Sequence, residues 1–395
     1  MQVATLALHG GTPVRQSPLP YGRQSIDDED VAAVVETLRS DWLTTGPAVA
    51  AFEEAVAARA GARFAVAFSS GTAALHAAAF AAGLQEGDEA ITTPLTFAAT
   101  ANCVLYQGAT PRFADIRPSD LTLDPDRVAA AITPRTRAIL PMDYAGHPAQ
   151  FDAFLALAER HNLIVIEDAA HAIGASWQGR PAGSLAHLTI FSFHPVKHVA
   201  TGEGGMVVTN DPALAARVRR FRTHGIVYGV SEDEPWRYDL VDLGFNYRIS
   251  DLNCALGLSQ LAKLDWNLER RRAIARTYAD ALGPLPWLTL PQEAPGARSA
   301  WHLYAIQLNR ETLRAGRAEI FRALRAEGIG VQVHYHPVHL LQLYRDRFGY
   351  RPGSFPLAED AYERLISLPL FPSMTGEDVA DTIEAVVKVL RAYAR

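Results

Sequence analysis

The chain has 395 residues and a formal net charge of −6, with 49% hydrophobic and 20% charged residues, a composition that excludes a disordered protein. Its basic residues are scattered and no apolar run reaches 18 residues. The two cysteines are too few for a disulfide framework and lack the spacing of a metal site. We therefore expect a cytoplasmic protein that binds neither nucleic acid nor membrane, with room for a large domain and a smaller one.

The first part of the chain alternates strand and helix patterns. A helix is predicted over 27–39, and its apolar face carries Val31, Val34, Val35 and Leu38. Between about 49 and 222, short apolar runs alternate with helices such as 72–82 and 151–161. The runs are continuously hydrophobic, as strands buried on both faces are, so βαβ units in a mainly parallel sheet are predicted. The candidate strands are 64–68, 89–93, 110–114, 138–142, 163–167, 188–193 and 205–209.

The remainder of the chain has a different pattern. Apolar residues spaced by three or four follow Ser250 and predict one long helix to about Leu282, ended by the Gly-Pro-Leu-Pro segment at 283–286. Beyond it we expect an α+β unit with strands at 301–308 and 331–335, a helix at 319–327 and two later helices. The expected division is an N-terminal segment (1–26), a large domain (27–250), a linking helix (251–283) and a small C-terminal domain (284–395).

Three features of the large domain fit the chemistry of pyridoxal 5′-phosphate. This cofactor needs a lysine amine to form a Schiff base, an acidic partner for its pyridine nitrogen, and a seat for its phosphate. Lys197 lies in the run Phe-Ser-Phe-His-Pro-Val-Lys at 191–197, and Asp168 stands 29 residues earlier, at the end of a predicted strand. A Ser-Gly-Thr turn at 70–72 is the third feature.

The turn at 69–72 follows a buried strand and opens a helix. First-turn N–H groups have no partner within a helix, and they attract a phosphate dianion. Gly71 and Thr72 are therefore candidate phosphate ligands, and Ser192 would face the same cavity. Taken alone, Ser and Thr at this place are equally explained as ordinary helix caps.

Asp168 and Lys197 also have ordinary explanations, since a strand-end Asp often caps the next helix and most lysines are solvated surface charges. In the cofactor interpretation, Asp168 holds the pyridine nitrogen protonated. The pKa of Lys197 would be lowered by partial burial and by cationic neighbours such as His194 and His198. The features occur together at strand ends and in a consistent order, which favours the cofactor site.

Two further features fit the same site. Phe97 could stack on one face of the cofactor ring with Ala170 on the other, although Phe97 is equally explained as a core residue. The turn that holds Asn246 and Arg248 precedes the long helix, and a helix entry with a solvated arginine would explain it without any ligand.

Two clusters have weaker interpretations. His334, His336 and His339 are of metal-ligating type, but the end of a strand in a small domain is a poor metal context, so no metal is expected. The arginine run at 270–272 could meet a diphosphate, whereas a solvated helix face explains it as well.

On these motifs, the sequence resembles the DegT/DnrJ/EryC1/StrS family of sugar-nucleotide aminotransferases over essentially its whole length. The resemblance implies a type I pyridoxal-phosphate-dependent aminotransferase fold, α/β with a mainly parallel central sheet. It also implies a homodimer with active sites at the subunit interface, in which Asn246 reaches the partner's cofactor phosphate. The motifs that carry the resemblance lie at 44–47, 69–75, 167–172, 192–197, 201–205 and 244–248.

Within the family, the sequence is most similar to the pseudaminic-acid branch, the UDP-4-amino-4,6-dideoxy-N-acetyl-β-L-altrosamine transaminases. This implies amino transfer from L-glutamate to C4 of a UDP-4-keto-6-deoxy-N-acetylhexosamine, with Lys197 as the acid–base group. We expect His171 to orient Asp168 or the cofactor hydroxyl. The segments that carry this similarity lie at 20–26, 93–97, 144–146, 194–197 and 331–335. The sequence departs from the usual pattern in an N-terminal extension through Arg15 and in the pair Val199-Ala200. Candidate substrate contacts are Thr45, His194, Arg248, His334 and Tyr335.

Several alternatives stay open at this point. The acceptor could be another nucleotide-linked keto sugar, of the perosamine, bacillosamine or legionaminic type. A sugar dehydratase of the same fold works without the lysine, and a non-enzymatic sensor would need neither Lys197 nor Asp168. A dinucleotide oxidoreductase would need a Gly-x-Gly-x-x-Gly turn after a strand, and the sequence has none. Lys197 and Asp168 therefore favour the aminotransferase.

Overall fold

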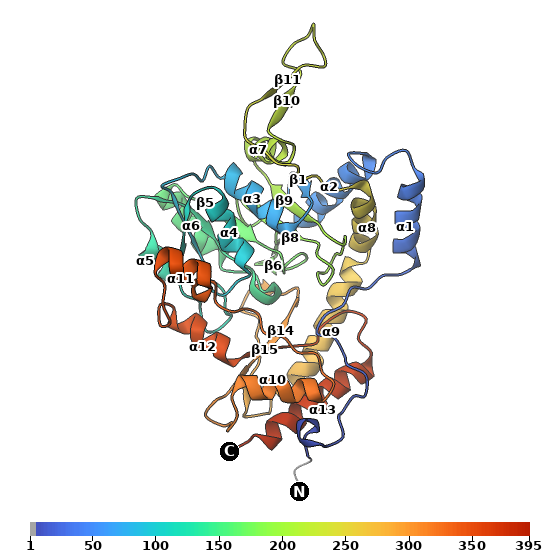
Figure 1. Ribbon diagram of the computed structural model, residues 1–395, viewed down its shortest axis with the longest axis vertical. Helices are drawn as coiled ribbons and strands as arrows, with labels where there is room; N and C mark the ends of the chain where they lie inside the picture. Colours follow the sequence, from blue (N-terminus) through green and yellow to red (C-terminus); the bar gives the residue numbers. More distant parts are fainter. Residues whose placement is uncertain (1–4) are drawn as a thin grey trace.

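The computed structural model describes residues 5–395, and a seven-stranded sheet lies at its centre (Figure 1). The strand order is β1-β9-β8-β5-β4-β2-β3. Neighbours run parallel from β8 to β3, whereas β9 is antiparallel to both of its neighbours. The predicted mainly parallel sheet is confirmed. Its strands are β1 Phe64–Phe68, β2 Glu89–Thr92, β3 Thr110–Phe113, β4 Thr136–Leu140, β5 Ile164–Asp168, β8 Leu188–Ser192 and β9 Gly205–Thr209.

Helices cover both faces of this sheet, which explains why its strands are hydrophobic without alternation. Along β1, Val66 and Phe68 pack in a core with the helix that follows the strand, whereas Ala65 and Ala67 pack in a second core on the opposite face. The first core includes α3 (Gly71–Ala81), α4 (Ala98–Tyr106) and α7 (Pro212–Arg222); α2 (Pro47–Ala60) belongs to the second, and α5 (Pro125–Ala131) and α6 (Phe151–His161) to a third.

The N-terminal helix α1 (Asp28–Arg39) begins where the sequence predicts. Asp27 and Asp30 form a capping box, in which each carboxylate accepts a hydrogen bond from the other residue's backbone N–H. The predicted apolar face of this helix is not buried, however, since Val31 is 53% and Leu38 59% exposed. These side chains are thus available to a partner rather than part of the core.

The single long helix predicted from 250 to 282 is wrong. The segment consists of two helices, α8 (Asp251–Ala262) and α9 (Leu264–Leu282), which meet at Lys263. The ammonium of Lys263 lies 2.6 Å from carboxylate oxygens of both Asp27 and Asp30. The apolar spacing continues through Lys263, so the sequence pattern contains no sign of this break.

The C-terminal part contains a three-stranded antiparallel sheet in the order β12-β14-β15. Leu6 and Leu19 belong to its core, so the described N-terminal residues pack beside the C-terminal helix (Figure 1). Its elements are β12 Leu288–Thr289, β14 Tyr304–Leu308, α10 Arg317–Ala326, η3 Val338–Leu340, α11 Gln342–Phe348, α12 Pro356–Arg364, β15 Leu365–Leu368 and α13 Gly376–Ala392.

Two predictions for this part are wrong. Residues 331–335 form no strand, and their bridge to the small sheet is confined to Gln332 and Ser367. The third strand is instead β15, which is four residues long and therefore too short to show a period in the sequence. Three α-helices rather than two follow α10.

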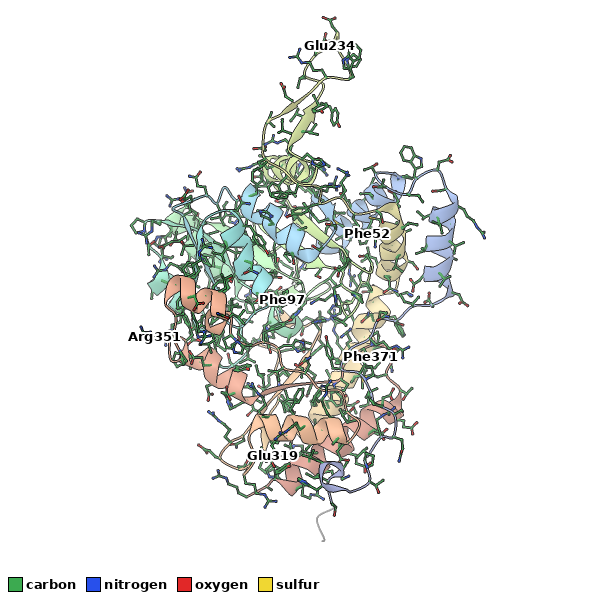
Figure 2. All side chains as sticks on the ribbon, viewed as in Figure 1. Phe52, Phe97, Glu234, Glu319, Arg351 and Phe371 are labelled. Carbon is green, nitrogen blue, oxygen red and sulfur yellow. The ribbon has the colours of Figure 1, made fainter. Side chains whose placement is uncertain are left out.

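A hairpin of β10 (Ile226–Tyr228) and β11 (Tyr238–Leu240) projects beyond α7, and Glu234 marks its outer end (Figures 1 and 2). The hairpin and the segment after it expose large apolar side chains, reaching 73% for Trp236 and 81% for Leu243. An exposed apolar surface of this extent is typical of a protein–protein interface. We call residues 226–245 the arm; its exposed apolar residues are Tyr228, Val230, Trp236, Tyr238, Leu240, Val241, Leu243 and Phe245.

The smaller elements complete the described chain. They are β6 Ser176–Trp177, β7 Arg180–Pro181, β13 Ala297–Arg298, η1 Ala7–His9 and η2 Tyr144–Gly146. Among residues 5–395, no helix is both long and apolar enough to cross a membrane. The four-part domain division given above stays a prediction.

Candidate active site

A cavity of about 410 Å³ lies at the carboxyl ends of β5 and β8. This is the sheet edge at which open α/β proteins bind ligands. The start of α3, the segment before α4, the loop after β8 and the segment 331–335 form its walls. All but three of the predicted site residues line it: Gly71, Thr72, Phe97, Asp168, Ala170, His171, Ser192, His194, Lys197, His334 and Tyr335.

Thr45, Asn246 and Arg248 are the three predicted site residues that do not line this cavity. Thr45 and Asn246 are exposed on the surface, and Arg248 is half-buried. Asn246 directly follows the arm and is bridged to Thr223. If these residues act on a ligand, that ligand lies outside the cavity of their own chain.

The chain contains three lysines, and one of them faces the cavity. Lys263 is engaged by Asp27 and Asp30, and the ammonium of Lys388 lies 2.8 Å from Glu327 Oε2. Lys197, in contrast, makes no ion pair within the described residues. Burial lowers the pKa of Lys197 to about 8, although the charge of Asp168 acts in the opposite direction. At pH 7 about one tenth of this amine is therefore neutral, and thus nucleophilic, which is far more than for an ordinary lysine.

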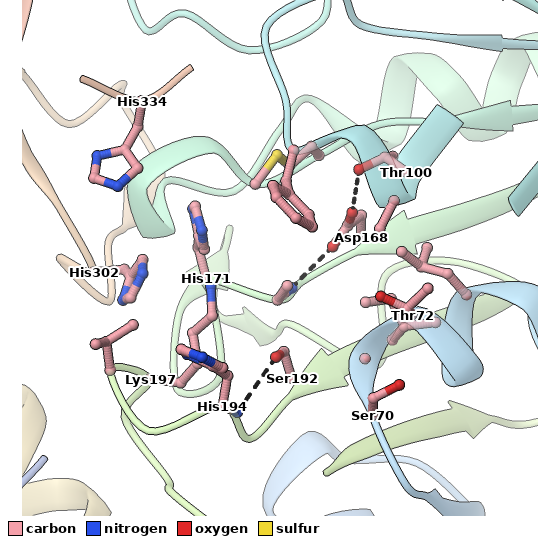
Figure 3. A pocket seen from close by; sticks show the side chains of 18 of the residues that line it. Ser70, Thr72, Thr100, Asp168, His171, Ser192, His194, Lys197, His302 and His334 are labelled. Atoms are coloured by element: carbon pink, nitrogen blue, oxygen red, sulfur yellow. Dashed lines mark hydrogen bonds between the residues drawn. The ribbon is translucent and has the colours of Figure 1, made fainter. Parts of the chain in front are cut away.

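Asp168 ends β5 and is buried in the floor of the cavity (Figure 3). Its Oδ2 accepts a 2.6 Å hydrogen bond from the Thr100 hydroxyl, and its Oδ1 accepts one of 3.1 Å from the Ala170 N–H. Burial raises the pKa of Asp168, while these two donors and the charge of Lys197 lower it. A buried carboxylate that is held in place and lacks a close cation is suited to a cationic ring nitrogen of a ligand.

Another wall of the cavity is formed by the first turn of α3. Ser70 caps this helix by accepting from the Ala73 N–H, at 3.1 Å. The N–H groups of Gly71 and Thr72 have no hydrogen-bond partner within residues 5–395. A Cβ at Gly71 would lie 3.0 Å from the Ser192 Cβ, so glycine lets the helix start approach the Ser192 hydroxyl closely. The result is an anion seat of backbone N–H groups and hydroxyls.

His171 was expected to orient Asp168 or the cofactor hydroxyl. The structure does not support the first possibility, because Asp168 is held by Thr100 and Ala170, whereas His171 Nε2 pairs with the Tyr335 hydroxyl at 3.0 Å. Burial, reinforced by nearby Lys197, His334 and His198, lowers the pKa of His171 well below its usual value. His171 is therefore a neutral imidazole on the cavity wall.

Sequence analysis missed several residues of this cavity, among them Tyr21, Thr100 and His302. The imidazole of His302 packs against that of His171 in a tilted arrangement, with ring centroids 4.2 Å apart. Thr100 lies within the run at 93–100, three residues after Phe97, so one turn of helix places the two on the same side. His302 had no such signal, because it reaches the cavity from the segment before β14.

The histidine trio at 334–339 does not converge on one point. His334 faces the cavity and pairs with Ser367 Oγ at 2.9 Å, His336 packs on Tyr362, and His339 Nε2 lies 3.0 Å from Glu359. Within residues 5–395, no group of three potential ligand side chains is arranged to hold a metal ion.

Neither interpretation of the arginine run at 270–272 is correct for its central residue. Arg270 donates to the carbonyls of Pro372 and Met374, and Arg272 to those of Gly174 and Ser299. Arg271 is 1% exposed and points into the protein, so it meets neither a diphosphate nor solvent.

These groups fit pyridoxal 5′-phosphate in type and in order. The anion seat at α3 suits its phosphate, Asp168 suits its pyridine nitrogen, and Lys197 is an amine that could bind its aldehyde. Phe97 is 58% exposed although it borders the cavity, which leaves its ring free to cover a planar ligand (Figure 2). Figure 3 shows Lys197 on the opposite side of the pocket from Ser70 and Thr72, as a ligand that spans the pocket requires.

The fold and this site define a pyridoxal-phosphate-dependent aminotransferase of fold type I. Comparison with known proteins then gives the family. A model of the DegT/DnrJ/EryC1/StrS aminotransferase family matches residues 24–387, and the chain belongs to this family. It is thus a sugar aminotransferase, as its resemblance predicted.

Three relatives illustrate the match. The spore coat polysaccharide biosynthesis protein SpsC of Bacillus subtilis is 44% identical over 378 residues, which cover 94% of this chain and 97% of SpsC. PseC of Helicobacter pylori, an aminotransferase in the biosynthesis of pseudaminic acid, is 34% identical with a TM-score of 0.89, covering 95% of this chain and all of PseC. The sugar aminotransferase Spr1654 of Streptococcus pneumoniae, in its PLP form, is 28% identical with a TM-score of 0.89, over 95% and 99% of the chains.

Proposed function

We propose that this enzyme transfers the amino group of L-glutamate to C4 of a UDP-4-keto-6-deoxy-N-acetylhexosamine, for a pseudaminic-acid-type nonulosonic acid or a surface glycan. The observation that carries the transaminase chemistry is the single amine of Lys197 in a cavity that ends in a buried carboxylate and an anion seat. The likeness to PseC over 95% of the chain supports the choice of sugar.

When bound, pyridoxal phosphate supplies an electron sink for the negative charge that develops at the carbon bearing the amino group. The protein then has to move one proton in each half-reaction. Lys197 is the base that takes the Cα proton of glutamate, and in the second half-reaction it delivers a proton to C4 of the sugar. Its pKa of about 8 lets it serve in both directions near neutral pH. Proton transfer of this kind contributes about 10²–10⁴-fold to the rate.

The remaining cavity residues hold the reactants. Asp168 would keep a ring nitrogen protonated, and Thr100 and the Ala170 N–H favour the ionised form of Asp168 by donating to both of its oxygens. Gly71, Thr72 and Ser192 bind the phosphate. Phe97 and Ala170 enclose the ring between them. The neutral His171, held by Tyr335, presents its ring to the cofactor without adding a charge.

The sugar nucleotide would enter at the side lined by His194, His334 and Tyr335. His194 is exposed at the cavity rim, whereas His334 is buried deeper. Imidazoles and a phenol suit the hydroxyl and acetamido groups of a sugar, because these side chains can donate and accept hydrogen bonds.

We also propose that the enzyme is a homodimer with each active site completed by the other subunit. The arm exposes a run of large apolar side chains, and Asn246 and Arg248 follow it directly. An arm laid across a second copy would bury this surface and carry Asn246 to the partner's anion seat. Thr45, with the exposed residues Trp42 and Leu43, would meet the same interface. Most such oligomers have twofold symmetry, so both sites would be completed at once.

A second acceptor has support of its own. SpsC, whose identity to this chain is 44%, is a spore coat polysaccharide biosynthesis protein. A different nucleotide-linked keto sugar is therefore the alternative, with the same donor and the same roles for Lys197 and Asp168. Both proposals place the enzyme in the cytoplasm, in keeping with its two buried free thiols, Cys103 and Cys254.

A substrate panel separates these proposals. The purified enzyme is offered UDP-, dTDP- and GDP-linked 4-keto-6-deoxy sugars with L-glutamate, and 2-oxoglutarate and the aminated sugar are both quantified. We expect the UDP-linked N-acetylated sugar to give the highest kcat/KM. A higher value with another nucleotide or without the acetamido group would favour the second acceptor. Loss of water without amine transfer would instead indicate a dehydratase.

The lysine assignment has a direct test. The holoprotein is reduced with borohydride, digested and analysed by mass spectrometry. We expect the cofactor adduct on Lys197, with Lys263 and Lys388 unmodified because carboxylates engage both. An adduct on either of those two, or no adduct at all, would contradict the proposal.

A further inference from the structure

Arg271 is a buried cation without an acidic partner. Its side chain is 1% exposed, and within residues 5–395 no carboxylate lies within 4 Å of its guanidinium. It donates instead to uncharged oxygens, namely Asn267 Oδ1 at 2.7 Å and the carbonyls of Leu370 at 2.9 Å, His302 at 3.2 Å and Trp301 at 3.3 Å. A charge in this setting is not neutralised, so its field reaches the surrounding interior with little screening.

The hydrogen bonds of Arg271 lead to the lysine loop. Asn267, which accepts from the guanidinium, donates its own Nδ2–H to the carbonyl of His198 at 2.8 Å. His198 is the residue after Lys197. Its ring Nε2 donates to the Ala300 carbonyl at 2.9 Å, which fixes the same loop to the segment before His302. Arg271 and Asn267 thus connect α9 to the backbone that carries the amine.

We propose that Arg271 is a positioning residue for the Lys197 amine: through Asn267 it fixes the lysine loop, and its uncompensated charge favours the neutral, reactive form of the amine. The inference rests on the proposed function, in which Lys197 reacts as an amine. Arg271 takes the cationic role that was expected of His198, whose pKa burial lowers well below its usual value.

The other groups around Lys197 support this assignment. The pKa of Lys197 is lowered by burial first, Asp168 opposes this effect, and Arg271 adds to it. Burial also lowers the pKa of His171, His198, His302 and His334, so these imidazoles are neutral and carry no charge that could act on the amine near pH 7. The remaining titratable groups that line the cavity are Tyr21, His194, Glu203 and Tyr335.

An arginine is the suitable residue for this position. A buried lysine without a counterion readily loses its proton, whereas a guanidinium stays charged and its planar fork can satisfy several carbonyls at once. Burial lowers even the pKa of Arg271, to about 9, which leaves it charged at pH 7. A purely mechanical role would need the hydrogen bonds alone and would not depend on the charge.

The test measures the titration of Lys197 in the apoprotein, where neither cofactor nor sugar takes part. Reductive methylation with ¹³C-formaldehyde labels three lysines and the N-terminal amine, so the NMR spectrum holds few resonances, and a Lys197→Arg sample assigns the relevant one. Arg271→Met removes the charge at nearly constant length. Asn267→Asp keeps the guanidinium and places a carboxylate beside it, and it also removes the Nδ2–H donor to the His198 carbonyl. Arg270→Met is the matched control, since Arg270 is the preceding residue and also donates to backbone carbonyls.

We expect Arg271→Met and Asn267→Asp to raise the titration midpoint of Lys197 by on the order of one pH unit, and Arg270→Met to leave it unchanged. If circular dichroism shows that Arg271→Met does not fold, the Lys197 midpoint in Asn267→Asp alone tests the inference. An unchanged midpoint in a folded variant, or an equal rise with Arg270→Met, would overturn the inference. A wild-type midpoint near that of a free lysine would instead remove a premise of the proposed function, so the two failures are distinguishable.

Discussion

The hydroxyl of Thr100 donates a 2.6 Å hydrogen bond to Oδ2 of Asp168 in the interior of the protein. Burial makes ionisation of Asp168 unfavourable, and this bond is one of the interactions that offset the effect. Thr100 lies in the first turn of α4, and α4 begins directly after Phe97, so the same turn supports the carboxylate and positions the aromatic ring at the cavity rim.

Replacement of Thr100 by Val should therefore raise the pKa of Asp168, because the charged form loses a donor. A smaller fraction of Asp168 is then ionised at a given pH. The acidic limb of the kcat/KM profile should therefore move to higher pH by about one unit, because a hydrogen bond to a charged group contributes about 1.5 kcal/mol. The measurement is a pH–rate profile. Thr100→Ser retains the hydroxyl and should keep the wild-type profile; equal shifts for both variants would count against this role.

Asp143 and Glu167 form a buried carboxyl pair behind the site. Burial, and then the charge of Glu167, raises the pKa of Asp143 well above its ordinary value, so Asp143 holds a proton. A carboxyl group whose pKa is higher in the folded than in the unfolded protein stabilises the fold at pH values below the unfolded-state pKa. This stability is lost as pH rises through the folded-state pKa. Asp143→Asn keeps an acceptor for the Ala149 N–H without a titrating proton.

The apoprotein carrying Asp143→Asn should lose less stability than the wild type as pH rises. Each proton bound by the folded but not by the unfolded protein lowers the free energy of unfolding by about 1.4 kcal/mol per pH unit. Urea unfolding at a series of pH values measures this difference. Asp152→Asn, which changes an exposed ion pair with Arg180, is the control and should keep the wild-type slope. Identical slopes for all three proteins would show that the pair does not hold the proton.

Lys197→Met should stabilise the apoprotein near pH 7. The pKa of this lysine is about 8 in the folded state and about 10.4 in the unfolded state, so its charge destabilises the fold at every pH below about 8. The lost stability is recovered as pH rises from about 8 to about 10. Because the side chain is partly solvated, we expect a gain of about 1–3 kcal/mol in the free energy of unfolding. Lys263→Met should have the opposite sign, since it leaves buried Asp30 without its ammonium. A Lys197→Met protein weaker than wild type would disprove the argument.

Phe97→Ala should weaken cofactor binding with little effect on folding. The side chain is 58% exposed, so its removal takes little apolar surface from the core. Loss of an aromatic face against a ring is worth about 0.5–1.5 kcal/mol, which corresponds to an increase of about two- to thirteenfold in the Kd for pyridoxal phosphate. Spectroscopic titration of the apoprotein measures the Kd, and Phe97→Tyr should restore it. Unchanged affinity in the alanine variant would mean that the ring does not stack.

Serine at both Trp236 and Leu243 should shift the enzyme from dimer to monomer. These two side chains are the most exposed large apolar residues of the arm, and their removal takes apolar area from the proposed interface. Sedimentation velocity gives the mass. Leu343→Ser changes a 54% exposed leucine on α11 and should leave the mass unchanged. A wild type that sediments as a monomer at micromolar concentration would rule out the proposed dimer.

The strands and helices that the sequence predicted well are those with strong local signals. β1 and α6 have the predicted bounds, because both are continuous patterns with a clear end, such as the left-handed Asn162 after α6. The site residues on β5, β8 and α3 were predictable for a related reason. Parallel strands end at one edge of the sheet, so residues that follow each strand meet there.

Other features depend on contacts that no local pattern encodes. The break lies at Lys263, whose ammonium pairs with Asp27 and Asp30, more than 200 residues away. Arg271 appeared to belong to a solvated run of arginines, and its burial follows only from how α9 docks against the segment 301–302. His302 entered the cavity from that same segment.

The scarcity of lysine has a practical corollary. Reducing sugars and other free aldehydes glycate side-chain amines, and this chain offers three, of which carboxylates engage two. An enzyme that handles an aldehyde cofactor and keto sugars thus presents few adventitious sites for carbonyl damage. Prolonged storage with a reducing sugar would modify the apoenzyme first inside its own cavity, whereas the loaded enzyme would be protected there.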